Sequence, residues 1–381
     1  MRPPDRVVAA LRDLPSPVCA YVYDRQALRD RADAVRAALP FATLLYAVKA
    51  NGHPDVVRTL AAACDGVEVA SGGELLLAQA AGARRIVFGG PAKTDAELAA
   101  ALAAGAQVNI ESGQELRRLD RLAREAGVVA SACVRVNRAT AALPGSHAMT
   151  GAPTPFGVEE SQLGEVLALP HDQVTVTGFH LHAVSNNLDG PAHARFLADA
   201  LDWSVRAAAR HGIHLRTVNA GGGFGVDYLS DATIDLAAVG AGVTVPAGVE
   251  LIVEPGRLLA ADAGWYAAEV VDLKQAHGRR FAVVRGGTHH FRLPAAWGYS
   301  HPSTVLSRAA WPYPWERPRW NDQTVDVAGE LCTPRDILAR DQPVTDLAIG
   351  DVLVFGRAGA YGWDISHHEF LRHPPPSFIV V

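Results

Sequence analysis

The sequence predicts a (β/α)8 barrel, the TIM-barrel class of α/β fold, joined to a C-terminal β-rich domain. Eight short apolar runs alternate with helical stretches over roughly the first 260 residues, and this count and length match such a barrel. From about residue 265 the pattern changes to strands separated by loops. Polar residues follow the apolar runs, where barrel enzymes place their chemistry. A doubly wound open sheet is the alternative, but such sheets usually have fewer strands.

Each predicted barrel strand is a short apolar run bounded by polar residues or glycine. In chain order the runs are LLYAV (44–48), VEV (67–69), IVF (86–88), VNI (108–110), ACVRV (132–136), VTVTGFHLH (174–182), TVN (217–219) and ELIV (250–253). Helices are expected between them, over residues 53–64, 71–82, 93–105, 112–127 and 191–212. SGGE (71–74) and SGQE (112–115) resemble capping boxes at two helix starts.

The β-rich domain is expected over residues 263–381, with residues 1–24 added to it. Its strand-like runs are WYAAEVVDL (265–273), RRFAVVRGG (279–287), QTVDVAGELC (323–332), DVLVFGRAG (351–359) and SFIVV (377–381). PVCAYVYD (17–24) precedes the first barrel unit and can pair into this domain. The barrel is therefore expected over 25–262, with the β-rich domain completing its active site.

Charge and composition exclude several classes of partner. The net charge of −5 offers no basic field for nucleic acid or an anionic membrane. No run approaches the roughly 20 apolar residues of a membrane span, and the first residues lack a signal-peptide core. The four cysteines are scattered without a CxxC motif, which fits a reducing compartment. The expected location is the cytoplasm.

The first predicted strand is followed by Lys49, within YAVKAN (46–51). A buried ammonium group is costly unless it is paired, neutralised or used chemically. Any single polar residue at a strand end is usually an ordinary loop residue, but many converging on one barrel face predict an active site. The others are Glu68, Ser71, Gly89, Gly90, Glu111, Arg135, Asn137, His182, Ser185, Gly221, Gly222, Gly223, Glu254 and Arg257.

Two of these motifs favour an anionic, planar ligand. NAGGGFG (219–225) follows the seventh strand, where barrels often bind phosphate on closely approaching backbone N–H groups; a plain glycine turn is the alternative. His180 and His182 share one side of a strand, but no third ligand has metal-site spacing, so no metal is expected. A histidine lying flat on a ring, with Ser185 bonding an anion, fits the glycine loop better than a purely structural histidine.

The eighth strand ends in EPGR (254–257). A carboxylate in a barrel mouth needs a cationic or protonated partner, so Glu254 either pairs with Arg257 or holds a protonated ring nitrogen. A lysine amine, a phosphate loop, a flat histidine and such a carboxylate together predict a pyridoxal 5'-phosphate site.

Seven motifs resemble those of the fold-type III pyridoxal phosphate decarboxylases, the family of ornithine, arginine and diaminopimelate decarboxylases. They are YAVKAN, VEVASGGEL, HLHAVS, GGGFG, EPGR, GELC and GAYG, spread from about residue 17 to the end. The whole series is specific, whereas each motif alone is not. The resemblance implies a barrel with a β-rich domain, the cofactor, and decarboxylation of an amino acid.

The resemblance also implies roles by position. Lys49 resembles the lysine that binds the cofactor covalently, His182 the histidine stacked on its ring, and Glu254 the partner of its ring nitrogen. The residues that match positions near the phosphate are Ser185, Gly222, Gly223 and Arg257. Val184 stands where the family usually has glycine, so the turn before Ser185 can differ.

Two matching residues lie in the predicted β-rich domain. Tyr361 in GAYG resembles a tyrosine that contacts the cofactor. Cys332 in GELC resembles the cysteine that reprotonates the product, which in this family comes from the partner subunit of a homodimer. The resemblance thus implies Lys49, His182 and Cys332 as the catalytic residues.

The residues after the cysteine depart from the family pattern. Ornithine and diaminopimelate enzymes carry an acidic residue there that reads the distal amine, whereas this chain has Thr333, followed by Arg335. Because arginine binds carboxylate bidentately, this change favours a substrate with an anionic distal group. A simple pairing of Arg335 with Asp336 or solvent is the alternative.

Further stretches resemble decarboxylases of carboxylate siderophore pathways, which act on citryl–diamino acid conjugates such as citryl-diaminopropionate. These are HAMTGAPTPFGVEE, SNNLD, AAWGYSHP, AGELCTPRDILARD and ISHHEFLRHP; part of the region around the first stretch lies near residue 147. The competing functions are diaminopimelate decarboxylase and, from another class, a non-catalytic relative that regulates a partner. An amino-acid racemase of the same fold would pair the ring nitrogen with arginine, so Glu254 disfavours it.

Five aromatic and histidine residues receive no role from the sequence. They either shape the substrate pocket or pack loops of the β-rich domain, and they are Trp297, Tyr299, His301, His367 and His368.

Overall fold

The computed structural model describes residues 2–139 and 143–381. The chain forms two compact units. The barrel unit comprises Arg29–Asp227 and Ala232–Leu259, and the β-rich unit comprises the residues up to Leu28, Tyr228–Asp231 and Ala260–Val381. The division into a cofactor-binding part over 25–262 and a completing part over the remainder stays a prediction.

The barrel unit is a closed ring of eight parallel strands, which confirms the predicted fold. The strands pair in the order β5-β4-β3-β2-β12-β11-β9-β6, and a pairing between β5 and β6 closes the ring. They are β2 (Ala42–Ala47), β3 (Gly66–Val69), β4 (Ile86–Phe88), β5 (Gln107–Ile110), β6 (Ala130–Asn137), β9 (Val174–His180), β11 (Thr217–Asn219) and β12 (Glu250–Val253). Each overlaps one of the eight apolar runs, because buried parallel strands are apolar on both faces.

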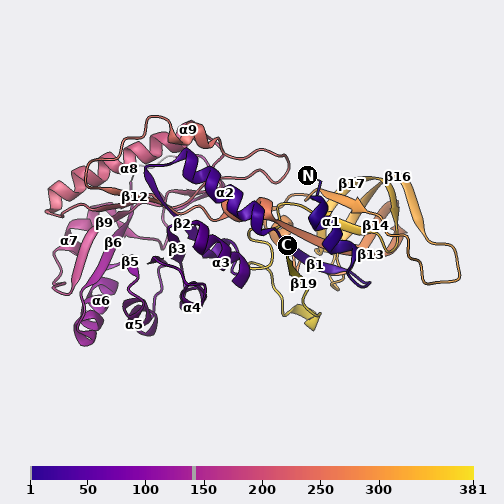
Figure 1. Cartoon of the computed structure of the whole chain (residues 1–381), viewed down its shortest axis with the longest axis horizontal. Helices are drawn as coiled ribbons and strands as arrows, with labels where there is room; N and C mark the ends of the chain where they lie inside the picture. Colours follow the sequence, from indigo (N-terminus) through magenta and orange to yellow (C-terminus); the bar gives the residue numbers. More distant parts are fainter. Residues whose placement is uncertain (1, 140–142) are drawn as a thin grey trace. The chain divides into compact units, whose positions relative to one another are not determined.

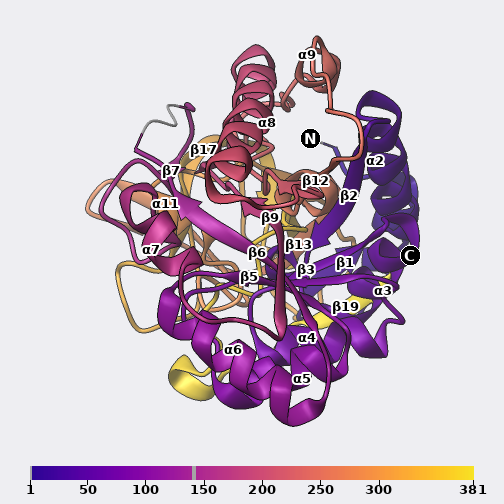
Figure 2. The ribbon, with the colours of Figure 1, turned by 90° about the vertical axis from the view of Figure 1, so that its left-hand side faces the viewer.

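Helices cover the outside of the ring; Figure 2 shows α4, α5 and α6 beyond the strands that they follow. Those of the barrel unit are α2 (Arg25–Ala38, entered from the β-rich unit), α3 (Pro54–Ala63), α4 (Gly72–Ala80), α5 (Asp95–Ala103), α6 (Gly113–Ala126), α7 (Leu163–Leu167), α8 (Gly190–His211), α9 (Leu236–Gly240) and α10 (Arg257–Ala260). The five predicted helices are confirmed as α3 to α6 and α8. The helices α7, α9 and α10 are only four or five residues long.

The two expected capping boxes differ from the prediction. Ser71 and Ser112 do cap their helices by accepting the Glu74 and Glu115 backbone N–H groups. The glutamates reach one residue further back than a capping box requires, since Glu74 accepts from Ala70 N–H and Glu115 from the N–H of the residue before Ser112. The helix α5 has the complete reciprocal box, between Thr94 and Glu97.

Two predicted strand ends are also corrected. The strand β2 stops at Ala47, and Lys49 lies in a 3₁₀ turn over Val48–Ala50. The strand β9 stops at His180, so His182 lies in the loop that follows it. Both corrections move a predicted site residue from a strand onto the loop side of the barrel mouth.

The barrel interior alternates polar and apolar layers. Leu45, Val87 and Ile252 form a buried apolar cluster from three strands. Two residues earlier in their strands, Arg85 donates from Nη2 to Glu250 Oε2 at 2.9 Å. The apolar layer thus separates this ion pair at the amino-terminal end from the polar residues at the carboxyl-terminal end.

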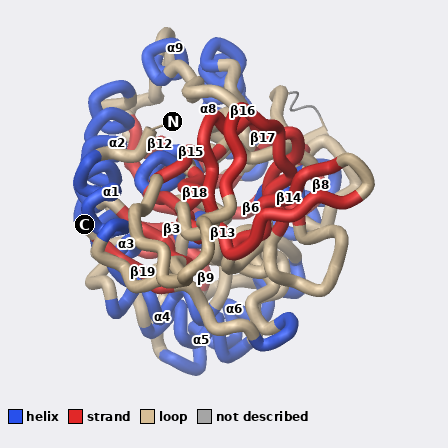
Figure 3. Tube along the Cα trace, turned by 90° about the vertical axis from the view of Figure 1, so that its right-hand side faces the viewer, coloured by secondary structure: helices blue, strands red, loops and turns tan. Residues whose placement is uncertain are grey.

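The β-rich unit is built on one eight-stranded sheet, whose strands Figure 3 shows in red. Its path is β15-β18-β13-β14-β16-β17, and β1 joins β13 to β19. The strands are β1 (Cys19–Tyr23), β13 (Gly264–Ala276), β14 (Arg279–Val284), β15 (Ser303–Leu306), β16 (Arg319–Ala328), β17 (Ile337–Ala348), β18 (Val352–Phe355) and β19 (Ser377–Val380). The predicted pairing of residues 17–24 into this sheet is confirmed, since Cys19 faces Ala268 of β13.

A helix that the sequence did not predict, α1 (Asp5–Arg12), completes the core of this unit (Figure 1). Its Val7 and Leu11 lie four residues apart and are buried against Trp265 and Val354. The remaining short elements are β7 (His147–Ala148), β8 (Val158–Glu159), β10 (Val184–Ser185) and α11 (Leu293–Trp297), and 3₁₀ turns over Glu160–Gln162, Ala261–Ala263 and Phe370–Arg372. Within the described residues, none of the helices has the length and apolar character needed to cross a bilayer.

Candidate active site

The Lys49 ammonium group is paired at the barrel mouth. Its Nζ lies 2.5 Å from Oε2 of Glu68, whose side chain is only 4% exposed. Neighbouring strands place them together, because Ala47 of β2 pairs with Glu68 of β3 and Lys49 follows two residues later. The amine is 45% exposed, so it is both neutralised and accessible.

Glu254 is a fully enclosed carboxyl at the end of β12. Asn219 Nδ2 donates to its Oε1 at 2.6 Å, and His180 Nε2 lies 3.7 Å from its Oε2. Burial, reinforced by the nearby Glu68 carboxylate, raises the pKa of Glu254 to about 7. The site therefore favours a proton on, or a cation against, this carboxyl.

His180 and His182 lie with their rings nearly parallel, 21° apart and 6.4 Å between centroids. Burial, reinforced by Arg135, holds the pKa of both well below the usual 6.5. His182 Nδ1 accepts the Gly222 N–H at 3.1 Å, so this nitrogen carries no proton. The His182 ring is thus a neutral, oriented plane.

The turn after β11 accepts only glycine. Gly221 and Gly223 have φ of +68° and +96°, the left-handed region. A Cβ at Gly221 would lie 2.6 Å from the His182 ring, at Gly222 2.6 Å from the Glu254 carbonyl oxygen, and at Gly223 2.8 Å from the Val184 carbonyl oxygen. The missing side chains therefore let this turn pack directly between the histidine loop and the end of β12.

Glu111 ties three further strand ends together. It accepts from Arg135 Nη1 at 3.0 Å and from the backbone N–H groups of Gly90 and Gly157 at 2.9 Å each. Arg135 is almost fully buried, so its charge stays at the mouth and contributes to keeping both histidines neutral.

The EPGR turn packs against the turn that carries Lys49. A Cβ at Gly256 would lie 2.9 Å from Ala50 Cβ and 3.0 Å from the Ala47 carbonyl oxygen. Arg257 is buried at the start of α10. Ser185 lies in β10, opposite His147 of β7. The structure thus gathers Lys49, His182, Gly222, Gly223 and Glu254 in one barrel mouth, with Ser185 and Arg257 on loops that adjoin it.

The other predicted residues belong to the β-rich unit. Cys332 is an exposed free thiol in the turn between β16 and β17. Thr333 and Arg335 line a cavity together. Tyr361 has φ of +54°, a backbone strain that non-glycine residues adopt mainly where function or tight packing requires it.

Sequence reasoning gave no role to Glu68 and missed Asn219. The signal for both is strand register: parallel pairing sets Glu68 beside the residue two before Lys49, and Asn219 beside Ile252, two residues before Glu254. Alternation along a strand then points each partner into the same mouth.

These residues fit pyridoxal phosphate. Both ring nitrogens of His180 are buried without a hydrogen-bond partner in the described part of the chain, although they face the Glu254 carboxyl. The glycine turn leaves backbone N–H groups uncovered by side chains, and Glu254 is set to share a proton. No cluster of three or more potential metal ligands is found among the described residues.

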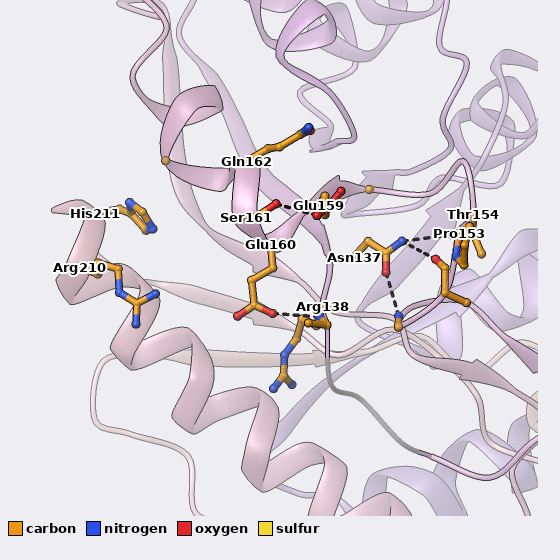
Figure 4. A pocket seen from close by; sticks show the side chains of 15 residues that line it. Asn137, Arg138, Pro153, Thr154, Glu159, Glu160, Ser161, Gln162, Arg210 and His211 are labelled. Atoms are coloured by element: carbon orange, nitrogen blue, oxygen red, sulfur yellow. Dashed lines mark hydrogen bonds between the residues drawn. The ribbon is translucent and has the colours of Figure 1, made fainter.

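A separate cavity of about 980 Å³ lies on the outer side of the barrel unit, beside α8 (Figure 4). Its charged groups make internal contacts: Glu160 accepts from Trp203 Nε1 at 2.7 Å and from Ala139 N–H at 3.0 Å, and Arg138 pairs with Asp199 at 2.6 Å. These contacts hold the loop after β6 against α8. None of the predicted site residues lines this cavity.

The five residues without a predicted role divide into two groups. His301 is buried structure, with Nδ1 bonded to Tyr299 Oη at 2.9 Å and Nε2 to the Gly356 carbonyl at 2.7 Å. His368 stacks on Trp363, and Trp297 packs edge-on against Tyr228. His367 and Tyr299 line the cavity that holds Thr333 and Arg335.

A family model described as "Pyridoxal-dependent decarboxylase, pyridoxal binding domain" matches residues 25–261. The chain is 36% identical to the 2-[(L-alanin-3-ylcarbamoyl)methyl]-2-hydroxybutanedioate decarboxylase of Staphylococcus aureus, covering 100% of this chain and 98% of that protein. It is 35% identical to the diaminopimelate decarboxylase of Deinococcus radiodurans, covering 94% and 89%.

Solved structures agree. Diaminopimelate decarboxylase from Helicobacter pylori complexed with L-lysine superimposes with a TM-score of 0.85, at 25% identity over 98% of this chain and 93% of that one. The lysine/ornithine decarboxylase of Vibrio vulnificus, at 20% identity and a TM-score of 0.82, shares the fold over 99% and 97% of the chains. The resemblance seen in the seven motifs is therefore confirmed, and the chain belongs to the pyridoxal-dependent decarboxylases, carboxy-lyases that use pyridoxal 5'-phosphate.

Proposed function

We propose that this decarboxylase acts on an amino acid joined by an amide to a hydroxylated polycarboxylate, of the citryl-diaminopropionate type, in carboxylate siderophore biosynthesis. The name of the S. aureus relative describes such a substrate: an alanine joined through its third carbon and a carbamoyl group to a hydroxybutanedioate. That relative matches the chain from end to end.

The single observation that carries the proposal is the state of Arg335. Among the described residues its guanidinium makes no ion pair, and only its backbone N–H is engaged, with Thr333 Oγ1 at 3.3 Å. The neighbouring Asp336 does not neutralise it, because its two oxygens accept the Thr288 and Leu331 backbone N–H groups at 2.6 and 2.8 Å. An exposed arginine where ornithine and diaminopimelate enzymes carry an acid favours an anionic distal group.

The barrel residues divide the work of holding the cofactor and moving protons. Lys49 would bind the cofactor covalently, and His182 would lie against its ring as a neutral plane. Gly222, Gly223, Ser185 and Arg257 would hold its phosphate, and Tyr361 would contact it as well. When bound, pyridoxal phosphate supplies a ring that takes up the electron pair left on Cα as CO2 departs. Glu254 keeps a proton on the ring nitrogen, which deepens this electron sink.

Cys332 is the proposed donor of the proton that replaces the lost carboxylate at Cα. Its thiol is exposed on the β-rich unit, as a group that acts in a partner's site must be. We therefore propose a homodimer with active sites shared across the interface. The four free cysteines support a reducing, cytoplasmic location.

Replacing Cys332 with alanine should lower kcat about 10²- to 10⁴-fold, the range for a positioned proton-transfer group, while cofactor absorption persists. Some turnover should be diverted to transamination, detected as carbonyl product. Cys64→Ala, which alters a buried thiol at the end of α3, is the control. Unchanged kcat in Cys332→Ala would remove the cysteine from the mechanism.

The second candidate is diaminopimelate decarboxylase. The D. radiodurans relative and the H. pylori structure, which holds L-lysine, favour it. A non-catalytic regulator fits less well, since both Lys49 and Cys332 are present.

The test compares CO2 release by purified holoenzyme from citryl-diaminopropionate and from diaminopimelate, with Lys49→Ala protein as the blank. We expect kcat/KM for the conjugate to exceed that for diaminopimelate roughly 100-fold or more, because a site built for bound polar groups rejects ligands that lack them. A preference for diaminopimelate would replace the proposal by the second candidate. No turnover of either would favour the regulator.

A further inference from the structure

The β-rich unit contains a cavity of about 660 Å³ with an unusual charge composition. Its walls come from two segments, 288–300 and 333–340, with His367 and Phe370 at the side. Three arginines line it, Arg292, Arg335 and Arg340, and its described lining contains no aspartate or glutamate. Its volume lies within the usual range of small-molecule sites.

The three guanidinium groups are little used by the protein itself. In the part of the chain that the structure describes, Arg292 and Arg335 make only backbone hydrogen bonds. Arg340 Nη1 lies 3.5 Å from Asp326, but both oxygens of that carboxylate already accept from Arg279, at 2.6 and 2.9 Å. The cavity therefore retains three cations able to bind an anionic ligand.

The cavity walls are held in place from behind. The buried Asp336 carboxylate bonds the backbone of Thr288 on one wall and of Leu331 at the foot of the other. A Cβ at Gly287 or Gly329 would lie 2.6 or 2.2 Å from that carboxylate, so both positions require glycine. Arg335 thus follows a fixed turn, which supports a built site rather than a mobile surface arginine.

Neutral donors complete the lining. Burial, followed by the charge of Arg292, lowers the pKa of His367, so its imidazole is neutral and can donate one N–H. The hydroxyls of Thr333, Ser300 and Tyr299 lie on the same walls. Three forked cations with hydroxyl and imidazole groups match two or more carboxylates and a hydroxyl on one small ligand.

We propose that this cavity is the specificity site for the polycarboxylate end of the substrate, where Arg292, Arg335 and Arg340 bind the carboxylates that are not released as CO2. The inference rests on the proposed function, since it names the residues that would read the anionic part of that substrate. It places substrate choice in the β-rich unit and leaves cofactor binding to the barrel residues.

The test uses citrate as a probe of the polycarboxylate end and citryl-diaminopropionate as substrate, both with holoenzyme. In Arg335→Gln, Arg292→Gln and Arg340→Gln, we expect the citrate Kd and the KM for the conjugate to rise about 10- to 100-fold each, the usual effect of losing a charged hydrogen-bonding group. We expect kcat and cofactor absorption to change little. Arg319→Gln removes an exposed arginine of β16 outside the cavity and should leave all four quantities unchanged.

The outcomes separate the two proposals. If the conjugate is turned over by the wild type and the arginine variants keep its KM and the citrate Kd, the cavity proposal is wrong and the proposed function stands. If the wild type does not decarboxylate the conjugate but loses citrate binding in the variants, the proposed function fails and the polycarboxylate site stands. Intact cofactor absorption in each variant shows that the protein has folded, and Arg335→Lys should restore part of the citrate affinity. Citrate binding that Arg319→Gln weakens equally would reduce the effect to net charge and overturn the cavity proposal.

Discussion

Lys49→Ala is expected to lower kcat roughly 10⁴- to 10⁶-fold, the scale seen when a covalent catalytic group is removed, and to abolish the visible absorption of lysine-bound cofactor. The chain has only three lysines, Lys49, Lys93 and Lys274. Lys93 is enclosed in an ion pair with Glu115, and Lys274 lies on the outer strand β13 beside Asp272. Lys49 is thus the one lysine that the barrel mouth presents to a cofactor.

Lys274→Ala is the matched control and should retain both activity and absorption. Borohydride reduction of the holoenzyme followed by peptide mass spectrometry should locate the cofactor on the peptide that contains Lys49. Its recovery on another lysine, or full activity of Lys49→Ala, would refute the assignment. Because the variant leaves the buried Glu68 without its cation, thermal unfolding should be measured in parallel.

The barrel could be predicted from the sequence because its strands are buried on both faces. Runs such as IVF and TVN are short, apolar and separated by helices with polar starts, so their number alone indicated the ring. Their ends were less predictable. Whether His182 continues β9 or leaves it depends on where the neighbouring strand stops pairing, and residues 181–183 carry no local signal for that.

The side-chain partners in the site could be predicted only in part. Lys49, His182 and Glu254 were found because each is costly at a strand end unless it has a use. Asn219 was missed because an asparagine before a glycine turn is ordinary locally, and its role appears only when β11 lies beside β12. The same holds for Asp336, whose bonds to Thr288 and Leu331 join segments about forty residues apart.

The β-rich unit shows the same limit at the level of topology. Five of its strands were predicted from composition, but not that β14 pairs in parallel with β16 or that β1 lies between β13 and β19. Such pairings join residues far apart in the chain, and no short motif specifies them. The unpredicted helix α1 has only two buried apolar residues, a pattern too sparse to separate from a loop.

Glu254→Gln is expected to reduce kcat about 10²- to 10⁴-fold with little loss of fold. The amide oxygen can still accept the Asn219 Nδ2 hydrogen bond that holds the side chain in place. It carries no negative charge and cannot keep a proton on the ring nitrogen of the cofactor. Activity should fall while KM and cofactor content change far less. Glu250→Gln is the control, because it alters a carboxylate of the same strand at the opposite end of the barrel.

The same variant should show the charge of Glu254 through stability. In cofactor-free protein, burial raises the pKa of this carboxyl from 4.5 to about 7, so the folded state binds its proton more tightly than the unfolded state does. Below pH 4.5 both states are protonated; between 4.5 and 7 the free energy of unfolding therefore falls as pH rises, by about 3 kcal/mol in total. Glutamine does not titrate, so Glu254→Gln should gain stability relative to wild type between pH 5 and 8 in urea unfolding. Parallel pH profiles for the two proteins would show that the carboxyl is not held in the protonated form, and with it the reason for placing a ring nitrogen against it would fall.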